Sequence, residues 1–326
     1  MSTVDWIGLV AVVVGAWGIP AVGMRMLVPS LETSARTDLN YRGRPVFLGL
    51  GIVWVFWAIG VYAFAFVTVG VLEPLEIGIV TQVIPLLLIF LFGLIDDSFG
   101  AVGQKGLRGH LRALAHGHLT TGALKLIGIT LAALWASGYA MASRSIGGGW
   151  TTFAYFVGLL AGTVLIAGAA NLLNLLDRRP GRALKGYGLL VGLAWAIMLV
   201  STATRAERSF SWIALAGLAV VFAGPALAVW RYDIGERGML GDAGANPAGA
   251  LAGVALAVAL PLWGIVVAAL VVVVLNIISE RVSFSQVIEA NRVLRWLDGL
   301  GRSPGDGAMA DATVSDDLPR NDGNDG

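Results

Sequence analysis

Long apolar blocks separated by shorter polar segments make up most of this chain. A helix of about 20 apolar residues is enough to cross the hydrocarbon of a bilayer, and the blocks are of about that length. They do not alternate apolar and polar residues, as the strands of a membrane barrel do. The pattern therefore predicts an all-α polytopic membrane protein with about nine transmembrane helices.

The predicted spans are separated by polar breaks, except for the last two, which meet at a tight turn around Pro261. The spans cover Trp6–Leu27, Val46–Gly70, Ile77–Ile95, Thr120–Ala142, Trp150–Ala170, Tyr187–Ala203, Trp212–Trp230, Pro247–Leu260 and Trp263–Ile278. The first run directly follows Asp5 and has no basic stretch before it, so we expect a retained span and not a signal peptide. In an eight-span alternative, one helix runs through Pro261.

The charged residues give this arrangement an orientation. They make up 13% of the chain, against about 25% in soluble proteins. With the N-terminus outside and nine spans, the basic residues lie toward the cytoplasm, apart from Arg144, Arg205 and Arg208. This bias satisfies the positive-inside rule, which the eight-span alternative would violate. We therefore expect a multi-pass protein of the inner (plasma) membrane with a cytoplasmic C-terminus and its chemistry on the cytoplasmic face.

Two further properties of the composition exclude classes of function. The net charge of +1 gives no indication of an acidic partner, and we expect no nucleic acid to bind. The chain has no cysteine, which excludes disulfides, thiolate catalysis and cysteine-ligated zinc.

Four cytoplasmic loops and a tail follow from the nine spans. The loops cover Pro29–Pro45, Asp96–Leu119, Asn171–Gly186 and Arg231–Asn246. We expect residues 1–280 to form one transmembrane domain and residues 281–302 an amphipathic helix on the membrane surface. Residues 303–326 have almost nothing apolar to bury, so we expect them to be disordered.

The first candidate site is the pair Asp96 and Asp97, directly after an apolar run. Adjacent carboxylates repel each other and raise each other's pKa unless a cation compensates. A polar stop to the helix is the simpler interpretation. Carboxylates are rare at membrane boundaries without a partner, which favours a functional pair.

Asn171, Asn174 and Asp177 form the second candidate. Their spacing of three residues would place them on one face of a helix end. Amide and carboxylate oxygens are ligands that suit Mg²⁺. Arg178, Arg179, Arg182 and Lys185 follow at once, and the alternative is that the segment is a positive-inside cluster and nothing more.

A glycine-rich segment, Gly238–Pro247, surrounds Asp242. Glycines at 241 and 244 would permit a phosphate to approach the backbone, and a helix start offers free N–H groups. The simpler interpretation is a turn in which Asn246 is the N-cap and Pro247 the first helical residue.

Lys125 lies about one turn into a predicted span, where a lysine is costly. Its ammonium either extends to the membrane surface or meets a pyrophosphate or the acidic pair.

Together and in this order, these motifs resemble the polyprenyl-phosphate N-acetylhexosamine-1-phosphate transferase superfamily. That superfamily includes phospho-N-acetylmuramoyl-pentapeptide transferases and undecaprenyl-phosphate N-acetylglucosamine-1-phosphate transferases. The resemblance covers roughly residues 4–280. The segments that carry it are Asn40–Pro45 with Leu48–Gly51, Gly93–Asp97, Lys125, Asn171–Asp177 and Met239–Gly244.

The resemblance implies transfer of a sugar 1-phosphate from a nucleotide sugar, UDP-linked in many relatives, to a polyprenyl phosphate in cell-wall biogenesis. It implies Mg²⁺, or alternatively Mn²⁺, held by Asp177 and Asp242, and it is compatible with a homodimer. Catalytic roles fall on Asp96, Asp97 and Lys125. Substrate-binding roles fall on Asn40, Arg42, Asn171, Asn174, Gly241 and Gly244. To these we add Arg178, Arg182 and Lys185 as anion-binding groups, by our own inference.

Three departures from the family pattern keep other hypotheses open. The second acid that usually follows Asp177 is absent, and a histidine motif of the last cytoplasmic loop has no counterpart near Glu289–Arg292. The chain also has fewer spans than its suggested relatives. One alternative is a catalytically degenerate binding or scaffold subunit. Another is a transporter of lipid-linked intermediates, although transporters place ionisable groups near the midplane of the membrane.

Overall fold

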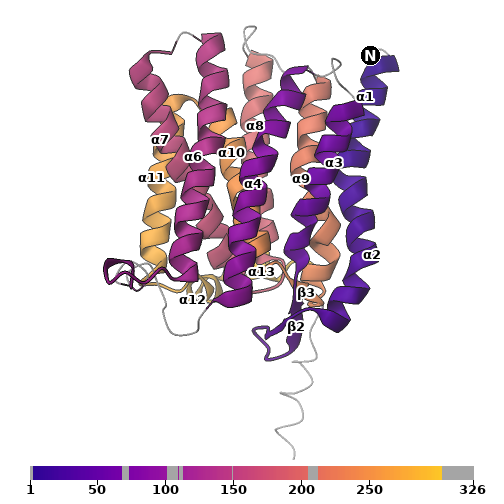
Figure 1. Cartoon of the computed structure of the whole chain (residues 1–326), viewed down its shortest axis with the longest axis vertical. Coiled ribbons are helices and arrows are strands. Elements are labelled where there is room, and N and C mark those ends of the chain that lie inside the picture. The colour runs from indigo at the N-terminus through magenta and orange to yellow at the C-terminus, as the bar shows by residue number, and fades with distance from the viewer. Residues whose placement is uncertain are drawn as a thin grey trace, which may run out of the picture.

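The computed structural model describes residues 3–67, 73–100, 109, 113–148, 150–204 and 212–302. Helices stand side by side in a bundle, with the N-terminus at the upper end in Figure 1. Within the described residues, seven helices are long and apolar enough to cross a membrane. They cover Trp6–Ser34, Gly78–Phe99, Thr121–Arg144, Thr152–Leu176, Arg182–Thr204, Trp212–Ile234 and Leu262–Ser279. The multi-span helical architecture expected from the apolar blocks is therefore present.

The elements follow one another along the chain with short connections. The helices are α1 (Thr3–Val13), the π-helix η1 (Val14–Gly18), α2 (Ile19–Ser34), the 3-10 helix η2 (Leu50–Ile52), α3 (Val53–Val67), α4 (Glu73–Phe99), α6 (Thr121–Gly148), α7 (Thr152–Leu176), α8 (Arg182–Thr204), α9 (Trp212–Ile234), α10 (Gly241–Ala259), α11 (Leu262–Ser279), α12 (Phe284–Ala290) and α13 (Arg292–Gly299). The strands are β1 (Thr37–Leu39), β2 (Pro45–Leu48) and β3 (Gly238–Met239).

Helix α10 lies in the centre of the bundle. Every residue from Ala243 to Ala257 is buried, and its neighbours are α4, α7 and α8. Its composition explains this position, because alanine and glycine let other helices approach closely. A Cβ on Gly249 would collide with the backbone of Ala169 in α7. The predicted break at Pro261 is also present, since Pro261 is the N-cap of α11.

Several helices extend further into the polar segments than predicted. Helix α2 continues through Pro29 to Ser34. Helix α7 continues to Leu176 and α8 begins at Arg182, so the loop predicted from Asn171 to Gly186 is reduced to residues 177–181. Helix α10 begins at Gly241, so Asn246 and Pro247 lie inside it and the N-cap interpretation is wrong. The end of an apolar run marks where a span leaves the hydrocarbon core of the bilayer. The helix itself can continue, because its backbone hydrogen bonds also form in the head-group layer.

A small three-stranded sheet modifies the all-α expectation. Strands β1 and β2 pair in antiparallel register, with Asp38 opposite Val46. Strand β3 pairs with β2 in parallel, with Phe47 opposite Gly238. The sheet therefore joins the region of the first predicted cytoplasmic loop to the fourth loop, at the lower end of the bundle (Figure 1). The start predicted for the second span at Val46 is wrong, because Val46–Leu48 belong to β2 and α3 begins at Val53.

The C-terminal segment predicted to be amphipathic forms the two short helices α12 and α13, which lie across the lower end of the bundle in Figure 1. The tail predicted to be disordered, residues 303–326, lies outside the described residues, as do Arg205 and Arg208.

Candidate active site

The C-terminal ends of α4 and α7 and the starts of α6 and α10 bring five predicted residues together. We call this group the carboxylate cluster: Asp96, Asp97, Lys125, Asp177 and Asp242. The ammonium of Lys125 lies 2.5 Å from Oδ2 of Asp96 and also forms an ion pair with Oδ2 of Asp242. All three side chains are less than one-fifth exposed. Lys125 therefore meets one member of the predicted acidic pair, Asp96, and in addition Asp242.

The start of α10 is bound by carboxylates from two other helices. Asp97 accepts hydrogen bonds from the backbone N–H groups of Asp242 (3.0 Å) and Ala243 (2.9 Å). Oδ2 of Asp177 accepts from the N–H of Gly241 at 2.9 Å. Negative charge is stabilised at a helix N-terminus, where N–H groups lack helical partners. The amides that we expected to be open to a phosphate are therefore occupied by the protein's own carboxylates.

Glycines allow this close approach. Gly241 has a φ of +64°, and a Cβ there would lie 2.7 Å from Oδ2 of Asp97. On α4, a Cβ at Gly93 would lie 2.5 Å from the carbonyl oxygen of Asp242. Gly244 packs against Gly51, and its carbonyl accepts a hydrogen bond from the indole of Trp54. Gly244, predicted to contact substrate, thus packs inside the protein.

A second acid lies beside Asp177 and was not predicted. Asp233 in α9 is 2% exposed, and Asp177 is 7% exposed. Asp233 accepts a hydrogen bond from the N–H of Gly181 at 2.9 Å, which fixes the loop after Asp177. Burial and the negative charge of Asp233 raise the pKa of Asp177 well above its usual range, despite the hydrogen bond from Gly241.

Asp177 and Asp233 line a narrow crevice beneath the β1–β2 turn. Asn40, Tyr41, Arg178 and other residues complete its walls. Its free volume of about 10 Å³ is room for roughly one water molecule. Any ligand larger than a water molecule would therefore need the surrounding loops to move apart.

The β1–β2 turn is held by Glu236, which has a φ of +56°. The amide of Asn40 donates to Glu236 at 3.1 Å, and Arg42 forms an ion pair with it at 3.3 Å. The side-chain oxygen of Asn40 also accepts from the N–H groups of Arg42 and Arg44. The two predicted substrate ligands, Asn40 and Arg42, thus hold the turn beside the crevice.

The two asparagines of the Asn171–Asp177 motif do not share one environment. Asn171 is exposed and donates to Oδ1 of Asn276 in α11 at 2.5 Å. Asn174 is half-buried one turn closer to Asp177. The helical spacing was correct, but Asn171 faces α11 while Asp177 faces the start of α10.

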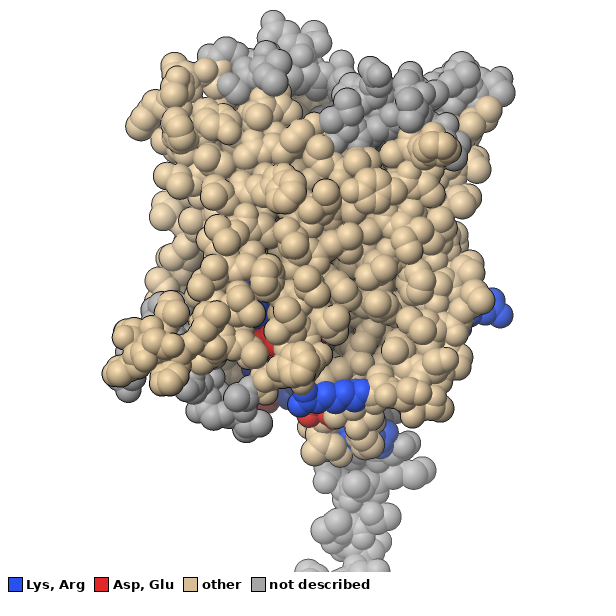
Figure 2. Space-filling view, viewed as in Figure 1, with Lys and Arg blue, Asp and Glu red and all other residues tan. Residues whose placement is uncertain are grey.

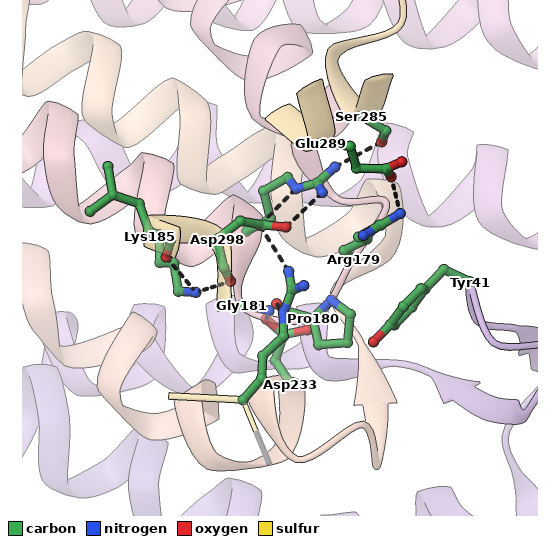
Figure 3. A network of polar contacts seen from close by, with 12 residues as sticks. Tyr41, Arg179, Pro180, Gly181, Lys185, Asp233, Ser285, Glu289 and Asp298 are labelled. Carbon is green, nitrogen blue, oxygen red and sulfur yellow. Dashed lines mark hydrogen bonds and ion pairs between the residues drawn. The ribbon is translucent and has the colours of Figure 1, made fainter. Parts of the chain in front are cut away.

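The basic residues after Asp177 also differ in their surroundings. Arg178 is exposed at the crevice. Arg179 pairs with Glu289 of α12 and lies over the ring of Tyr41 (Figure 3). Two residues predicted to bind anions, Arg182 and Lys185, instead contact α13.

Arg182 is almost completely buried, and its guanidinium makes hydrogen bonds of 2.8–2.9 Å to both carboxylate oxygens of Asp298 and to Ser285. Lys185 donates to the carbonyl of Asp298 at 2.5 Å (Figure 3). We therefore correct the predicted role of Arg182 and Lys185 from anion binding to attachment of α13. Sequence reasoning missed Asp298, although an acid in an otherwise apolar and basic helix is a weak signal for an internal partner.

No protein-family model matches the chain. No curated protein is significantly similar to it in sequence. The family resemblance therefore rests on the sequence motifs alone.

The donor chemistry of the carboxylate cluster suits Mg²⁺. Among the residues that the structure describes, no three acidic, histidine or cysteine side chains are grouped as a complete metal site. Mg²⁺ is commonly held by one or two carboxylates together with waters and substrate phosphates, so a full protein cage is not required. Asp177 and Asp242 fit that mode of binding, because Asp177 is hydrogen-bonded to the residue next to Asp242.

Proposed function

We propose that the carboxylate cluster transfers a sugar 1-phosphate from a nucleotide sugar, UDP-linked, to a polyprenyl phosphate. One observation carries the proposal: the ionisable residues of four separate motifs lie around the first turn of α10. Their carboxylates outnumber the ammonium of Lys125, and such an excess of negative charge favours a divalent cation, which in turn can bind substrate phosphates.

In the proposed reaction, an oxygen of the polyprenyl phosphate attacks the β-phosphorus of the donor. The bond between that phosphorus and the bridging oxygen breaks, and the nucleoside monophosphate leaves with the bridging oxygen. Phosphoryl transfer of this kind depends mostly on positioning and on charge neutralisation. A general base is scarcely required, because the second pKa of a phosphate is about 6.

Each residue of the cluster has a role in this proposal. Lys125 contacts a phosphate oxygen, and its positive charge compensates the negative charge of Asp96. Asp96 orients the polyprenyl phosphate acceptor. Asp97 positions Asp242 through the amides at the start of α10. Asp177 and Asp242 would hold Mg²⁺, which when bound supplies neutralisation of the pyrophosphate charge.

The basic residues favour a cytoplasmic location for this end of the bundle. Figure 2 shows Lys and Arg side chains in the lower half of this face, below a broad belt that shows no charged residue among those that the structure describes. Of the basic residues that the structure describes, Arg144 alone lies at the other end, where it donates to the carbonyls of Ala257 and Leu260. The positive-inside rule then assigns the carboxylate cluster to the cytoplasm and the N-terminus to the outside.

The test is mass spectrometry of the lipid product. Purified protein is incubated with polyprenyl phosphate, Mg²⁺ and a panel of nucleotide sugars. We expect a polyprenyl-pyrophosphoryl sugar from at least one donor. Asp177→Asn and Asp242→Asn should reduce its formation by at least about 100-fold, the scale of losing one strong electrostatic contact. The matched control is Asp38→Asn, at an exposed aspartate of β1.

Two results would change the assignment. Full activity of Asp177→Asn or Asp242→Asn would remove these residues from the metal site. Magnesium-dependent retention of a nucleotide sugar without any lipid product would favour the binding-subunit alternative.

A further inference from the structure

Helix α13 is attached to the start of α8 by a buried polar clamp, which we call the Asp298 clamp. Its members are Arg182, Lys185, Asp298 and Arg302. Arg182 binds both carboxylate oxygens of Asp298, and Arg302 binds one of them at 2.9 Å. Lys185 donates to two carbonyls at the C-terminal end of α13. Since Asp298 is buried while most of α13 is exposed, the clamp determines which side of α13 faces the bundle.

The face of α8 that carries Lys185 shows where α13 lies relative to the bilayer. Residues four apart share one face of a helix, so Leu189 and Leu193 continue the line of Lys185 up α8. Leu189 is 74% exposed and Leu193 is 52% exposed. These leucines lie within a helix with the length and hydropathy of a span, so they face lipid. Helix α13 therefore lies at the lower end of the bundle, below this lipid-facing stripe of α8, at the level where the spans end (Figure 1).

The side of α13 that points away from the clamp is apolar. Val293 is 64% exposed and Trp296 is 63% exposed, and Leu297 and Leu300 are also exposed. Tryptophan is enriched at membrane interfaces, where its ring meets the acyl chains and its N–H meets the head groups. Exposed apolar patches of this kind mark interaction surfaces.

The polar side of the same helix is basic. Arg292 and Arg295 are exposed in its first turns. An amphipathic helix with arginine on one side and tryptophan and leucine on the other binds in the plane of an anionic membrane surface. Its charge therefore complements anionic head groups.

We propose that α13 lies in the head-group layer of an anionic bilayer, with Val293 and Trp296 toward the acyl chains, and that the Asp298 clamp fixes this orientation. The partner is the lipid surface and not a second protein. This surface is separate from the carboxylate cluster, so the proposal does not depend on the proposed reaction.

The absence of cysteine from the chain makes the test direct. Single-cysteine variants Val293→Cys and Trp296→Cys carry a nitroxide spin label on the outer side of α13, and Arg295→Cys is the matched control on the polar side. The full chain is reconstituted in vesicles of phosphatidylcholine with or without phosphatidylglycerol. Collisions of the label with oxygen, which concentrates in lipid, are compared with collisions with a water-soluble nickel complex.

We expect the ratio of oxygen to nickel accessibility to be severalfold higher at positions 293 and 296 than at 295. The contrast should be larger with phosphatidylglycerol, and Asp298→Asn should reduce it because the helix can then rotate. Thermal unfolding of the Asp298→Asn protein would verify that the bundle itself remains folded.

Three results would overturn the proposal. Equal nickel accessibility at 293, 296 and 295 would place the apolar face in water. Protection of 293 and 296 from both reagents would mean that protein covers the face. A contrast that does not respond to phosphatidylglycerol would exclude anionic head groups as the partner.

Discussion

Replacing Asp97 with asparagine tests the structural basis of the carboxylate cluster. Both oxygens of Asp97 accept hydrogen bonds from consecutive amides at the start of α10, the central helix. Asparagine keeps one acceptor oxygen but turns an NH₂ group toward the other amide. The variant therefore loses one charge-assisted hydrogen bond and the negative charge at a helix N-terminus, without a large change in volume.

The magnitude follows from these opposing effects. A hydrogen bond to a charged group contributes about 1.5–3 kcal/mol, and the charge at the helix end contributes about 0.3–1 kcal/mol more. Removing Asp97 also relieves its repulsion with the neighbouring carboxylates, which is about 1 kcal/mol per pair at the dielectric constant of water and larger in a drier site. The ammonium of Lys125 offsets much of this repulsion, because it pairs with both Asp96 and Asp242. We expect Asp97→Asn to lower the free energy of unfolding by about 1–3 kcal/mol, and Asp97→Ala to lower it further because both hydrogen bonds are lost.

The measurement is thermal unfolding in detergent micelles, followed by intrinsic tryptophan fluorescence. The control is Asp38→Asn, because the side chain of Asp38 is exposed and accepts from the adjacent N–H of Leu39. It should leave the melting temperature almost unchanged. An Asp97→Asn protein that melts at or above the wild-type temperature would refute the reasoning, since carboxylate repulsion would then exceed the stabilisation of α10.

Three further predictions concern other parts of the structure. Gly93→Ala should destabilise the protein by about 1–3 kcal/mol through overpacking against α10. Gly188→Ala, with no atom within 4 Å of the added Cβ, should stabilise it by about 0.5–1 kcal/mol; the reverse order of melting temperatures would contradict the packing. Lys125→Met should reduce lipid product formation at least about 100-fold, and a loss below tenfold would exclude Lys125 from the reaction. Burial would raise the pKa of Asp298, but the hydrogen bond and charge of Arg182 lower it on balance. The stability from this pair is therefore fully present above the unfolded pKa of about 3.9 and is lost as pH falls through the native value. The protection of the α13 amides from hydrogen exchange, taken relative to their intrinsic rates, should fall below that pH, and unchanged protection would contradict the pairing.

The spans were predictable because lipid imposes a simple rule on sequence. A segment exposed to hydrocarbon must be apolar and helical, so the apolar runs mark where the helices lie. Their bounds differ from the prediction by up to seven residues, since α3 begins at Val53 and not at Val46. The helix ends were less predictable, as Leu176 and Gly241 show, because helices continue into the polar layer where composition no longer constrains them. The pairing of β2 with β3 was not predictable, since two or three residues form each partner and they are far apart in the chain.

The residues of the carboxylate cluster were found because a charged group next to an apolar run is costly, so it usually has a charged partner or a function. The same rule applied to Asp233, at the end of α9, would have found the second acid beside Asp177. The side chain that each charged residue pairs with was harder to predict than the charged residue itself. Arg182 appeared to be one of several basic residues after Asp177, and only the fold brings it to Asp298, 116 residues away. A sequence pattern identifies unusually placed charged residues but does not show which of them form ion pairs or hydrogen bonds with one another.

The central position of α10 has a consequence for the way the chain is assembled. This helix is not among the seven that are apolar enough to enter a bilayer unaided, and it carries Asp242 and Asn246 near its start. Its neighbours α4, α7 and α8 all precede it in the chain. During synthesis, α10 would therefore move into a space already lined by earlier helices, and the carboxylate cluster would be completed in one late step.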